Sequence, residues 1–202
     1  MRRDLYDDAL TLREARQKYF VANAFGLDGG YSLDWVDVKV GPIPFPFPNT
    51  KSRVRAVRFH DLHHIVTGYR TDLTGEFEIS AWEIAAGCKD ATAAWALNLA
   101  GMAGGVVTAP RRTWQAFLRG RASDTLYGRD YEALLSRTVA DVRDDVGIGR
   151  STPASARDAV LFAAAVVAGF AVGGALTAAA LPALPFGLVA MYRKRRRPYD
   201  TR

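Results

Sequence analysis

The residues best suited to chemistry are the three histidines, which all lie within five positions, and two acids close to them. They form the pattern His60-Asp61-x-x-His64, followed after eleven residues by Glu76. In a helix of 3.6 residues per turn, His60 and His64 share one face, and Asp61 lies about 100° further around the axis. If a second helix folds back over the first, Glu76 joins them in one pocket. We therefore predict a metal site with four ligands: His60, Asp61, His64 and Glu76.

Nitrogen and oxygen donors of this kind suit zinc, iron, manganese or cobalt better than magnesium, and no thiolate is present to select among them. Zinc is the first choice, and the other three divalent metals stay open. The competing interpretation is an ordinary exposed histidine pair, but the clustering of all three histidines around an acid favours a metal. His63 is interpreted as an outer or exposed histidine and not as a fifth ligand. Glu83 is interpreted as a solvated charge, with the orientation of a ligand as the alternative.

Two helices must position these residues, within a fold that is expected to be mainly α, a helical bundle. The first helix is expected over residues 59–67 and ends at Gly68, because helices commonly end at a glycine. Residues 69–75 form a loop, and Glu76 opens the second helix, which runs to residue 86. Further helices are predicted over residues 4–25, 111–120 and 130–146.

A small β-hairpin is expected near residues 35–58. Residues 35–40 alternate between apolar and polar side chains, as residues 53–58 do in part, which is typical of strands. Between them, residues 41–48 contain four prolines. Because a proline lacks the N–H donor, this stretch is predicted to be an extended connector with Ile43, Phe45 and Phe47 on one side. These side chains are interpreted as packing on the core; the alternative is a wedge at a membrane or the lip of a lipid tunnel.

The length of 202 residues indicates one domain with an appendage. The single Cys88 excludes an internal disulfide, fits a reducing compartment and is interpreted as a small buried side chain. The net charge of +6 is concentrated in residues 193–202, which contain six basic residues and one acidic residue, so the rest of the chain is nearly neutral. This argues against a nucleic-acid-binding fold. An acidic start without an apolar stretch argues against a cleaved targeting segment and favours a bacterial protein facing the cytoplasm.

Two stretches lack charged side chains, residues 91–110 and residues 159–192. The first is rich in alanine and glycine, and we predict a buried helix whose small residues face a groove with room for an isoprenoid tail. The second follows an expected hinge at residues 151–158. It is long enough for a transmembrane helix; alternatively, broken at Gly173-Gly174, it forms a hairpin that enters one leaflet. A buried soluble hairpin also stays open.

The hairpin is preferred because it leaves the metal domain and the basic run at residues 193–197 on the same, cytoplasmic face of the membrane. The chain is therefore divided into a helical metal-binding domain over residues 1–150, the hinge, and a membrane-association segment with a basic tail over residues 159–202. The location expected is the cytoplasmic face of the bacterial inner membrane.

The metal motif resembles the signature of the coenzyme Q biosynthesis protein 4 homologues. The intervening residues that also match are Gly68, Thr71, Leu73 and Gly75. A second matching segment contains Trp114, Gly120, Ala122, Leu126, Tyr131-Glu-Ala-Leu-Leu135 and Asp141-Val-Arg-Asp-Asp-Val-Gly-Ile148. The resemblance covers residues 50–150, about half of the chain, and does not extend to the first fifty residues or to the tail.

The resemblance implies a ubiquinone biosynthesis protein that carries out the metal-dependent, oxidative or non-oxidative, decarboxylation of a polyprenylated 4-hydroxybenzoate-type precursor at the membrane. Asp61 or Glu76 would then be the catalytic proton donor. The alternative is a non-catalytic, metal-stapled scaffold that binds the prenyl-quinone lipid and organises other enzymes of the pathway. The partners expected are this lipid, the membrane, those enzymes and a second copy of the chain in a homodimer. A metal-dependent hydrolase is disfavoured because no separate nucleophile or oxyanion-hole signature is visible.

Overall fold

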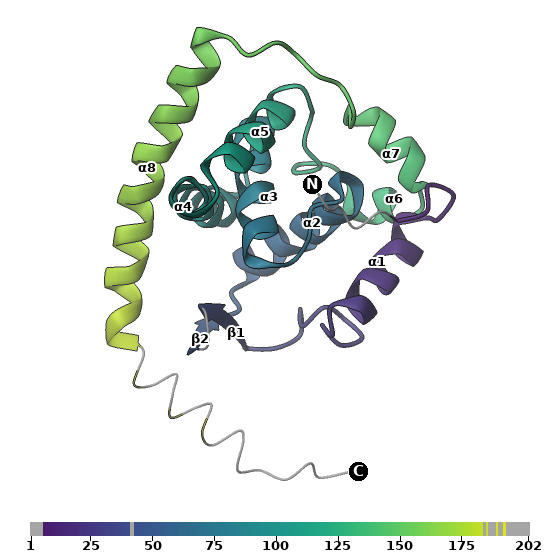
Figure 1. Ribbon diagram of the computed structural model, residues 1–202. Coiled ribbons are helices and arrows are strands. Elements are labelled where there is room, and N and C mark those ends of the chain that lie inside the picture. The colour runs from purple at the N-terminus through teal and green to yellow at the C-terminus, as the bar shows by residue number, and fades with distance from the viewer. Residues whose placement is uncertain (1–5, 41–42, 184, 186–188, 190–191, 193–202) are drawn as a thin grey trace, which may run out of the picture.

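The computed structural model describes residues 6–40, 43–183, 185, 189 and 192, and this part of the chain is mainly helical (Figure 1). The helices are α1 (Leu12–Ala22), α2 (Lys51–Thr67), α3 (Leu73–Ala86), α4 (Thr92–Thr108), α5 (Pro110–Arg121), α6 (Tyr131–Leu135), α7 (Val139–Asp145) and α8 (Ala156–Ala180), followed by a 3₁₀ turn at Leu181–Ala183. The strands are β1 (Trp35–Val40) and β2 (Ile43–Pro48).

Helices α2 and α3 lie at the centre of the bundle (Figure 1). The first packs against α1 and α7, and the second against α4 and α5, while α8 runs along the outer side of α4. The largest fully buried apolar side chains come from both halves of this arrangement: Leu12, Phe20, Leu62, Ile65, Tyr69, Ile79, Trp82, Met102, Leu126 and Leu135. The core therefore surrounds the two helices that carry the metal motif, which gives their side chains a rigid support.

Helix α2 begins about two turns earlier than predicted. Residues 53–58, predicted in part as a strand, form its first turns, so that prediction was wrong. The physical reason is the cap at Thr50, whose hydroxyl accepts a hydrogen bond from the N–H of Arg53 at 3.2 Å. The end of the helix was predicted correctly: Gly68 takes the left-handed conformation, with φ of 73°.

The predicted hairpin is present, but its second strand is the proline-rich stretch. Strand β2 pairs with β1 in antiparallel register, from Trp35 opposite Pro48 to Val40 opposite Ile43. Because prolines occupy every second position of β2, their missing N–H groups fall on one edge, and the other edge keeps its donors for β1. The side chains of Ile43, Phe45 and Phe47, predicted to share one side, are not among those that the structure describes.

Side-chain caps shorten or divide two of the predicted helices. The helix predicted over residues 4–25 is reduced to α1, which begins after a capping box formed by Thr11 and Glu14. The helix predicted over residues 130–146 is divided into α6 and α7, because Thr138 accepts a hydrogen bond from the N–H of Asp141 at 3.1 Å and starts a new helix.

The small residues of α4 bring helices together and do not line an open groove. A Cβ atom on Gly101 would lie 2.4 Å from the hydroxyl oxygen of Ser80 in α3. On another side of α4, a Cβ atom on Gly169 of α8 would lie 2.3 Å from the carbonyl oxygen of Leu99. These contacts fill the space beside both glycines, so where a groove for an isoprenoid tail was predicted, the small residues described here serve close helix packing.

Helix α8 passes through Gly173 and Gly174 without a break, so the turn predicted at this pair is wrong. It begins inside the predicted hinge, where Ser155 and Asp158 form a capping box. Among the described residues it is the one helix long and apolar enough to cross a bilayer, with a mean hydropathy of 2.3. The second arm of the predicted hairpin, beyond Pro185, lies largely outside the described residues. The division of the chain into a metal-binding domain, a hinge and a membrane-association segment stays a prediction.

Candidate metal centre

Three of the four predicted ligands meet between α2 and α3. The Nε2 atoms of His60 and His64 are 3.1 Å apart. Each of them lies 3.3 Å from a carboxylate oxygen of Glu76, which α3 supplies from its first turn. The three ligand atoms all lie within 4.8 Å of one another, close enough to share one metal ion. The one-turn spacing of the histidines and the returning helix thus produce the predicted convergence.

The hydrogen bonds of the outer ring nitrogens decide what the converging nitrogens can do. The Nδ1 atom of His64 lies 2.9 Å from the carbonyl oxygen of Tyr69, which can only accept, so this nitrogen carries the proton. The Nδ1 atom of His60 likewise donates to a carboxylate oxygen of Glu83 at 2.8 Å. In the neutral imidazoles, both Nε2 lone pairs therefore point at each other and at the carboxylate of Glu76. This donor set fits a cation.

The charges at the centre also fit a cation. Burial by itself would lower the pKa of His60, but the negative charge of Glu83 and the hydrogen bonds to Glu76 and Glu83 raise this pKa well above its usual value. Burial would raise the pKa of Glu76, but the neighbouring His64 and His60 lower it. The pocket between the helices therefore stabilises positive charge beside an ionised carboxylate.

The centre is buried on one side and open on the other. The side chain of His64 is 1% exposed, whereas that of His60 is 20% and that of Glu76 is 39% exposed. The triad is therefore exposed to solvent on the side of Glu76.

The fourth predicted ligand, Asp61, is not part of this group of three. Its buried carboxylate accepts hydrogen bonds from the hydroxyls of Tyr31 at 2.5 Å and Tyr19 at 3.3 Å. Burial raises the pKa of Asp61, against the hydrogen bond from Tyr31 and the nearby imidazoles. One helical step from His60 is enough to turn this side chain toward Tyr19 of α1, beside the group of three and not within it.

The structure also places two residues whose function the sequence left open. Glu83 is fully buried and not solvated, which corrects the first interpretation. One carboxylate oxygen accepts from His60 and His63, both at 2.8 Å, and the other accepts from Tyr127 at 2.6 Å and from Asn98. The spacing of seven residues from Glu76, which puts both acids on one face of α3, was the available signal.

His63 supports the candidate centre and is not part of the group of three. Its Nε2 atom accepts the N–H of Leu126 at 2.9 Å, so the proton lies on Nδ1, which donates to Glu83. Burial lowers the pKa of His63, which keeps the ring neutral. Both nitrogens are thus occupied, in agreement with the outer position predicted for it.

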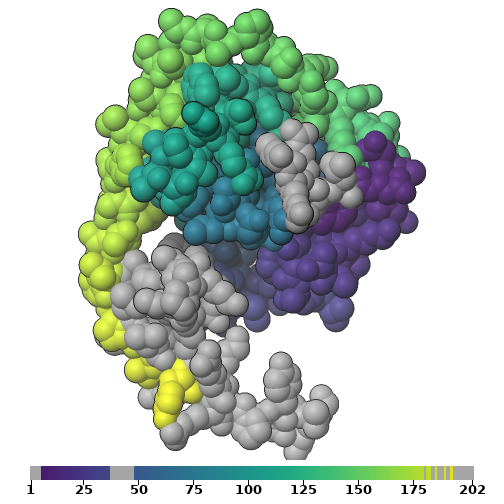
Figure 2. All heavy atoms as spheres, in the orientation of Figure 1, coloured from purple at the N-terminus to yellow at the C-terminus, as the bar shows by residue number. Residues whose placement is uncertain are grey.

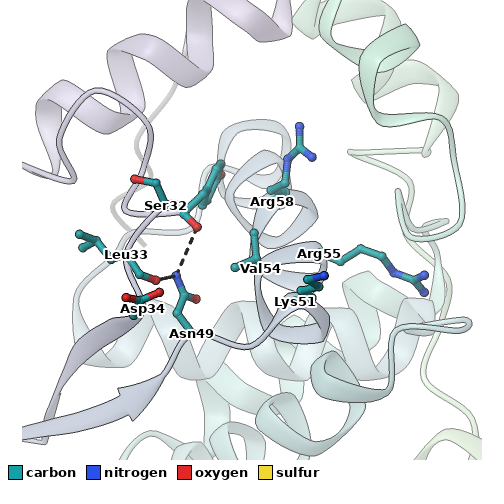
Figure 3. A pocket seen from close by; sticks show the side chains of 9 residues that line it. Ser32, Leu33, Asp34, Asn49, Lys51, Val54, Arg55 and Arg58 are labelled. Atoms are coloured by element: carbon teal, nitrogen blue, oxygen red, sulfur yellow. Dashed lines mark hydrogen bonds between the residues drawn. The ribbon is translucent and has the colours of Figure 1, made fainter.

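A surface pocket of about 330 Å³, lined in part by Tyr31, lies between residues 31–34 and the first half of α2 (Figure 3). Its basic side chains are Lys51, Arg55 and Arg58. Asn49 also lines it and donates hydrogen bonds to the carbonyl oxygens of Gly30 and Leu33. Through Tyr31, this pocket is one hydrogen bond away from the buried carboxylate.

No family model, curated protein or solved structure matches this chain. The family that the metal motif resembles therefore stays a prediction.

Proposed function

We propose that this chain binds a divalent metal ion through His60, His64 and Glu76 and that the resulting centre is catalytic. The observation that carries this proposal is the convergence of two imidazole lone pairs and one carboxylate, with Nδ1 of each imidazole already held by another acceptor. Three protein ligands leave a position for water or substrate, which is typical of catalytic and not of structural zinc sites. Zinc is the first choice, and the same set of donors also suits iron, manganese and cobalt.

We further propose that the substrate is a polyprenylated 4-hydroxybenzoate-type precursor of ubiquinone, held at the membrane. The motif between His60 and Glu76 supports this class of substrate, and the apolar α8 supports a lipid surface as its source. A bound divalent ion would supply Lewis-acid chemistry toward the ring carboxylate or the phenolate.

The two acids predicted as proton donors are suited to different tasks. Glu76, whose pKa is lowered, stays ionised and serves as a ligand. Asp61, whose pKa is raised by burial, is the better proton donor. In a non-oxidative decarboxylation, the bond between the ring carbon and the carboxylate breaks, carbon dioxide leaves, and the ring carbon takes up a proton. Asp61 would deliver that proton and recover it through the hydroxyl of Tyr31 from the solvated pocket.

The test combines metal analysis with turnover. Wild-type protein purified without chelator is expected to contain close to one equivalent of a divalent metal and to release carbon dioxide from vesicles that carry the polyprenylated acid. Glu76→Gln removes the charged ligand with little change of shape, so we expect loss of both the metal and the activity. Asp61→Asn is expected to keep the metal and to lose turnover.

The matched control is Asp144→Asn, since Asp144 is exposed on α7, which contributes no residue to the triad or to the pocket; it is expected to change neither readout. Folded wild-type protein that neither contains nor takes up a divalent metal would overturn the proposal. Metal binding and lipid retention without any turnover would instead support the non-catalytic scaffold.

A further inference from the structure

Helix α8 has one stripe that is docked to the body of the protein. At its first turn, Asp158 accepts a hydrogen bond from Arg121 of α5 at 3.0 Å. One turn later, the ring of Phe162 packs edge-on against Trp114 and Phe117 of α5, with centroids 4.9 and 5.2 Å apart. Two turns further, Gly169 lies against the backbone of α4. These positions recur at the spacing of one helix face, so α8 is held along most of its length.

The opposite stripe of α8 is apolar and exposed. Val160, Val167 and Phe170 are 68%, 70% and 54% exposed, and their spacing of seven and three residues places them on one face. In the space-filling view, α8 forms the outer rim of the molecule (Figure 2). A helix on the surface of a water-soluble protein usually carries polar side chains there, so this stripe requires a covering.

We propose that this stripe docks onto an anionic lipid bilayer, with α8 lying in the plane of the interface and not crossing it. This goes beyond the proposed function, because the attachment would hold whatever reaction the metal centre carries out. An interfacial helix needs an apolar half for the lipid and a polar half for water. Here the polar half is replaced by α4 and α5, on which α8 rests.

A transmembrane orientation would require α8 to leave these contacts. The length of α8, about 37 Å at 1.5 Å per residue, is enough to cross a bilayer core, so length does not distinguish a spanning from an in-plane orientation. A spanning helix, however, is surrounded by lipid. Either α8 would give up the ion pair between Asp158 and Arg121 and the packing at Gly169, or the arginines of α5 would enter the hydrocarbon. The in-plane orientation requires neither.

The chemistry of the stripe favours lipid over a second copy of the chain. Protein interfaces surround their apolar centre with a polar rim and form hydrogen bonds across it. Between residues 159 and 180, the one polar side chain is Thr177, whose hydroxyl donates to the carbonyl oxygen of Gly173 in the same helix at 2.8 Å. No hydrogen bond is therefore offered to a partner protein. The basic run at residues 193–197 follows in the sequence and complements anionic headgroups.

The first arm of the test is flotation of the full chain with vesicles of phosphatidylcholine alone or mixed with phosphatidylglycerol. Wild type is expected to float best with the anionic mixture. The double variant V167D/F170D is expected to float at least tenfold less and to keep its metal content. Val21→Asp is the matched control, because Val21 is equally exposed but lies on α1; it is expected to float like wild type.

The second arm separates the in-plane orientation from a spanning one. A Cβ atom on Gly173 would lie 3.6 Å from that of Ala100 on α4, a distance suitable for a disulfide. In the variant A100C/G173C, oxidation locks α8 onto α4, and flotation is expected to be unchanged. Loss of flotation on oxidation, with recovery on reduction, would overturn the proposal in favour of a span. Undiminished flotation of V167D/F170D would also overturn the proposal. So would a wild-type dimer that V167D/F170D converts to a monomer, because the stripe would then be an interface between two copies of the chain.

Discussion

At the scale of single residues, the buried carboxylate of Glu83 fixes the orientation of the candidate metal centre. It accepts hydrogen bonds from His60, His63, Tyr127 and Asn98 and is cut off from water. An unpaired buried carboxylate would be strongly destabilising, so the four donors and the charge stabilise one another. Because His60 is held at Nδ1, its Nε2 atom is aimed at the triad before any ligand arrives.

Glu83→Gln is expected to lower the metal affinity about 10- to 100-fold, because an amide cannot accept from both histidines and from Asn98 with equal strength. Tyr127→Phe removes one of the four donors and is expected to have a smaller effect. Competition with a chromophoric chelator measures both, with circular dichroism as the check on folding. An unchanged affinity in folded Glu83→Gln would show that the orientation of His60 does not depend on this carboxylate.

The thiol of Cys88 is expected to be inert in the folded protein. It is fully buried, and burial raises its pKa, so the reactive thiolate is rarer than in a free cysteine, whose pKa is about 8.5. At pH 8, a disulfide reagent should react fully only after denaturant is added. Val21→Cys, at an exposed position, should react at once. Rapid reaction of native wild type would contradict the buried position of this thiol.

At the scale of elements, the C-terminal end of α2 contributes both to the stability of the fold and to the position of His64. The last carbonyl groups of a helix lack partners within it. Arg143 of α7 donates to the carbonyl oxygens of Ile65 and Val66, each at 3.0 Å, and Arg119 of α5 donates to that of Thr67 at 3.4 Å. Positive charge at this end also interacts favourably with the helix dipole. The turn that carries His64 is thus held by side chains from two other helices.

Arg143→Ala is expected to lower the free energy of unfolding by about 1.5–3 kcal/mol, the usual contribution of hydrogen bonds to a charged group. Arg143→Lys should recover only part of this loss, because an ammonium cannot reproduce the planar fork of donors. Denaturant unfolding monitored by circular dichroism gives the measurement.

The matched control for Arg143 is Arg137→Ala, which removes an exposed ion pair with Asp145 and should cost at most about 1 kcal/mol. Equal losses in Arg137→Ala and Arg143→Ala would argue against a special contribution of the cap on α2.

At the scale of the whole molecule, the helical bundle with the candidate metal centre and the apolar helix form one packed unit, since α8 lies against both α4 and α5. Gly169 makes the close approach possible, because any side chain there would meet the backbone of α4. The candidate metal centre lies between α2 and α3, whereas this seam is formed by α4, α5 and α8.

Gly169→Leu is expected to weaken the docking of α8 by about 1–3 kcal/mol, the usual cost of overpacking. Trypsin should then cleave faster at Arg150, in the connector before α8, while the metal content stays the same. Ala168→Leu, one position along on the exposed side, is the control and should be cleaved like wild type. Equal cleavage of both variants would show that the seam at Gly169 does not hold α8.

Much of the local structure followed from the sequence by itself. The spacing of His60 and His64 placed them on one helix face, Gly68 ended that helix, and Glu76 returned to meet them, because helical period and backbone freedom act over a few residues. The absence of charge after Asp158 likewise predicted an apolar segment, but the preferred form was a hairpin divided at Gly173-Gly174, whereas the structure has one unbroken helix there.

The tertiary structure alone decided which side chains meet across the fold. Asp61 accepts hydrogen bonds from Tyr19 and Tyr31 of the N-terminal segment. His63 accepts one from the backbone N–H of Leu126, sixty-three residues away. The pairing of β1 with a proline-rich strand, the burial of Glu83 and the docking of α8 on α4 are of the same kind. Such contacts depend on which surfaces pack together once the elements exist, and periodicity along the chain carries no information about that choice.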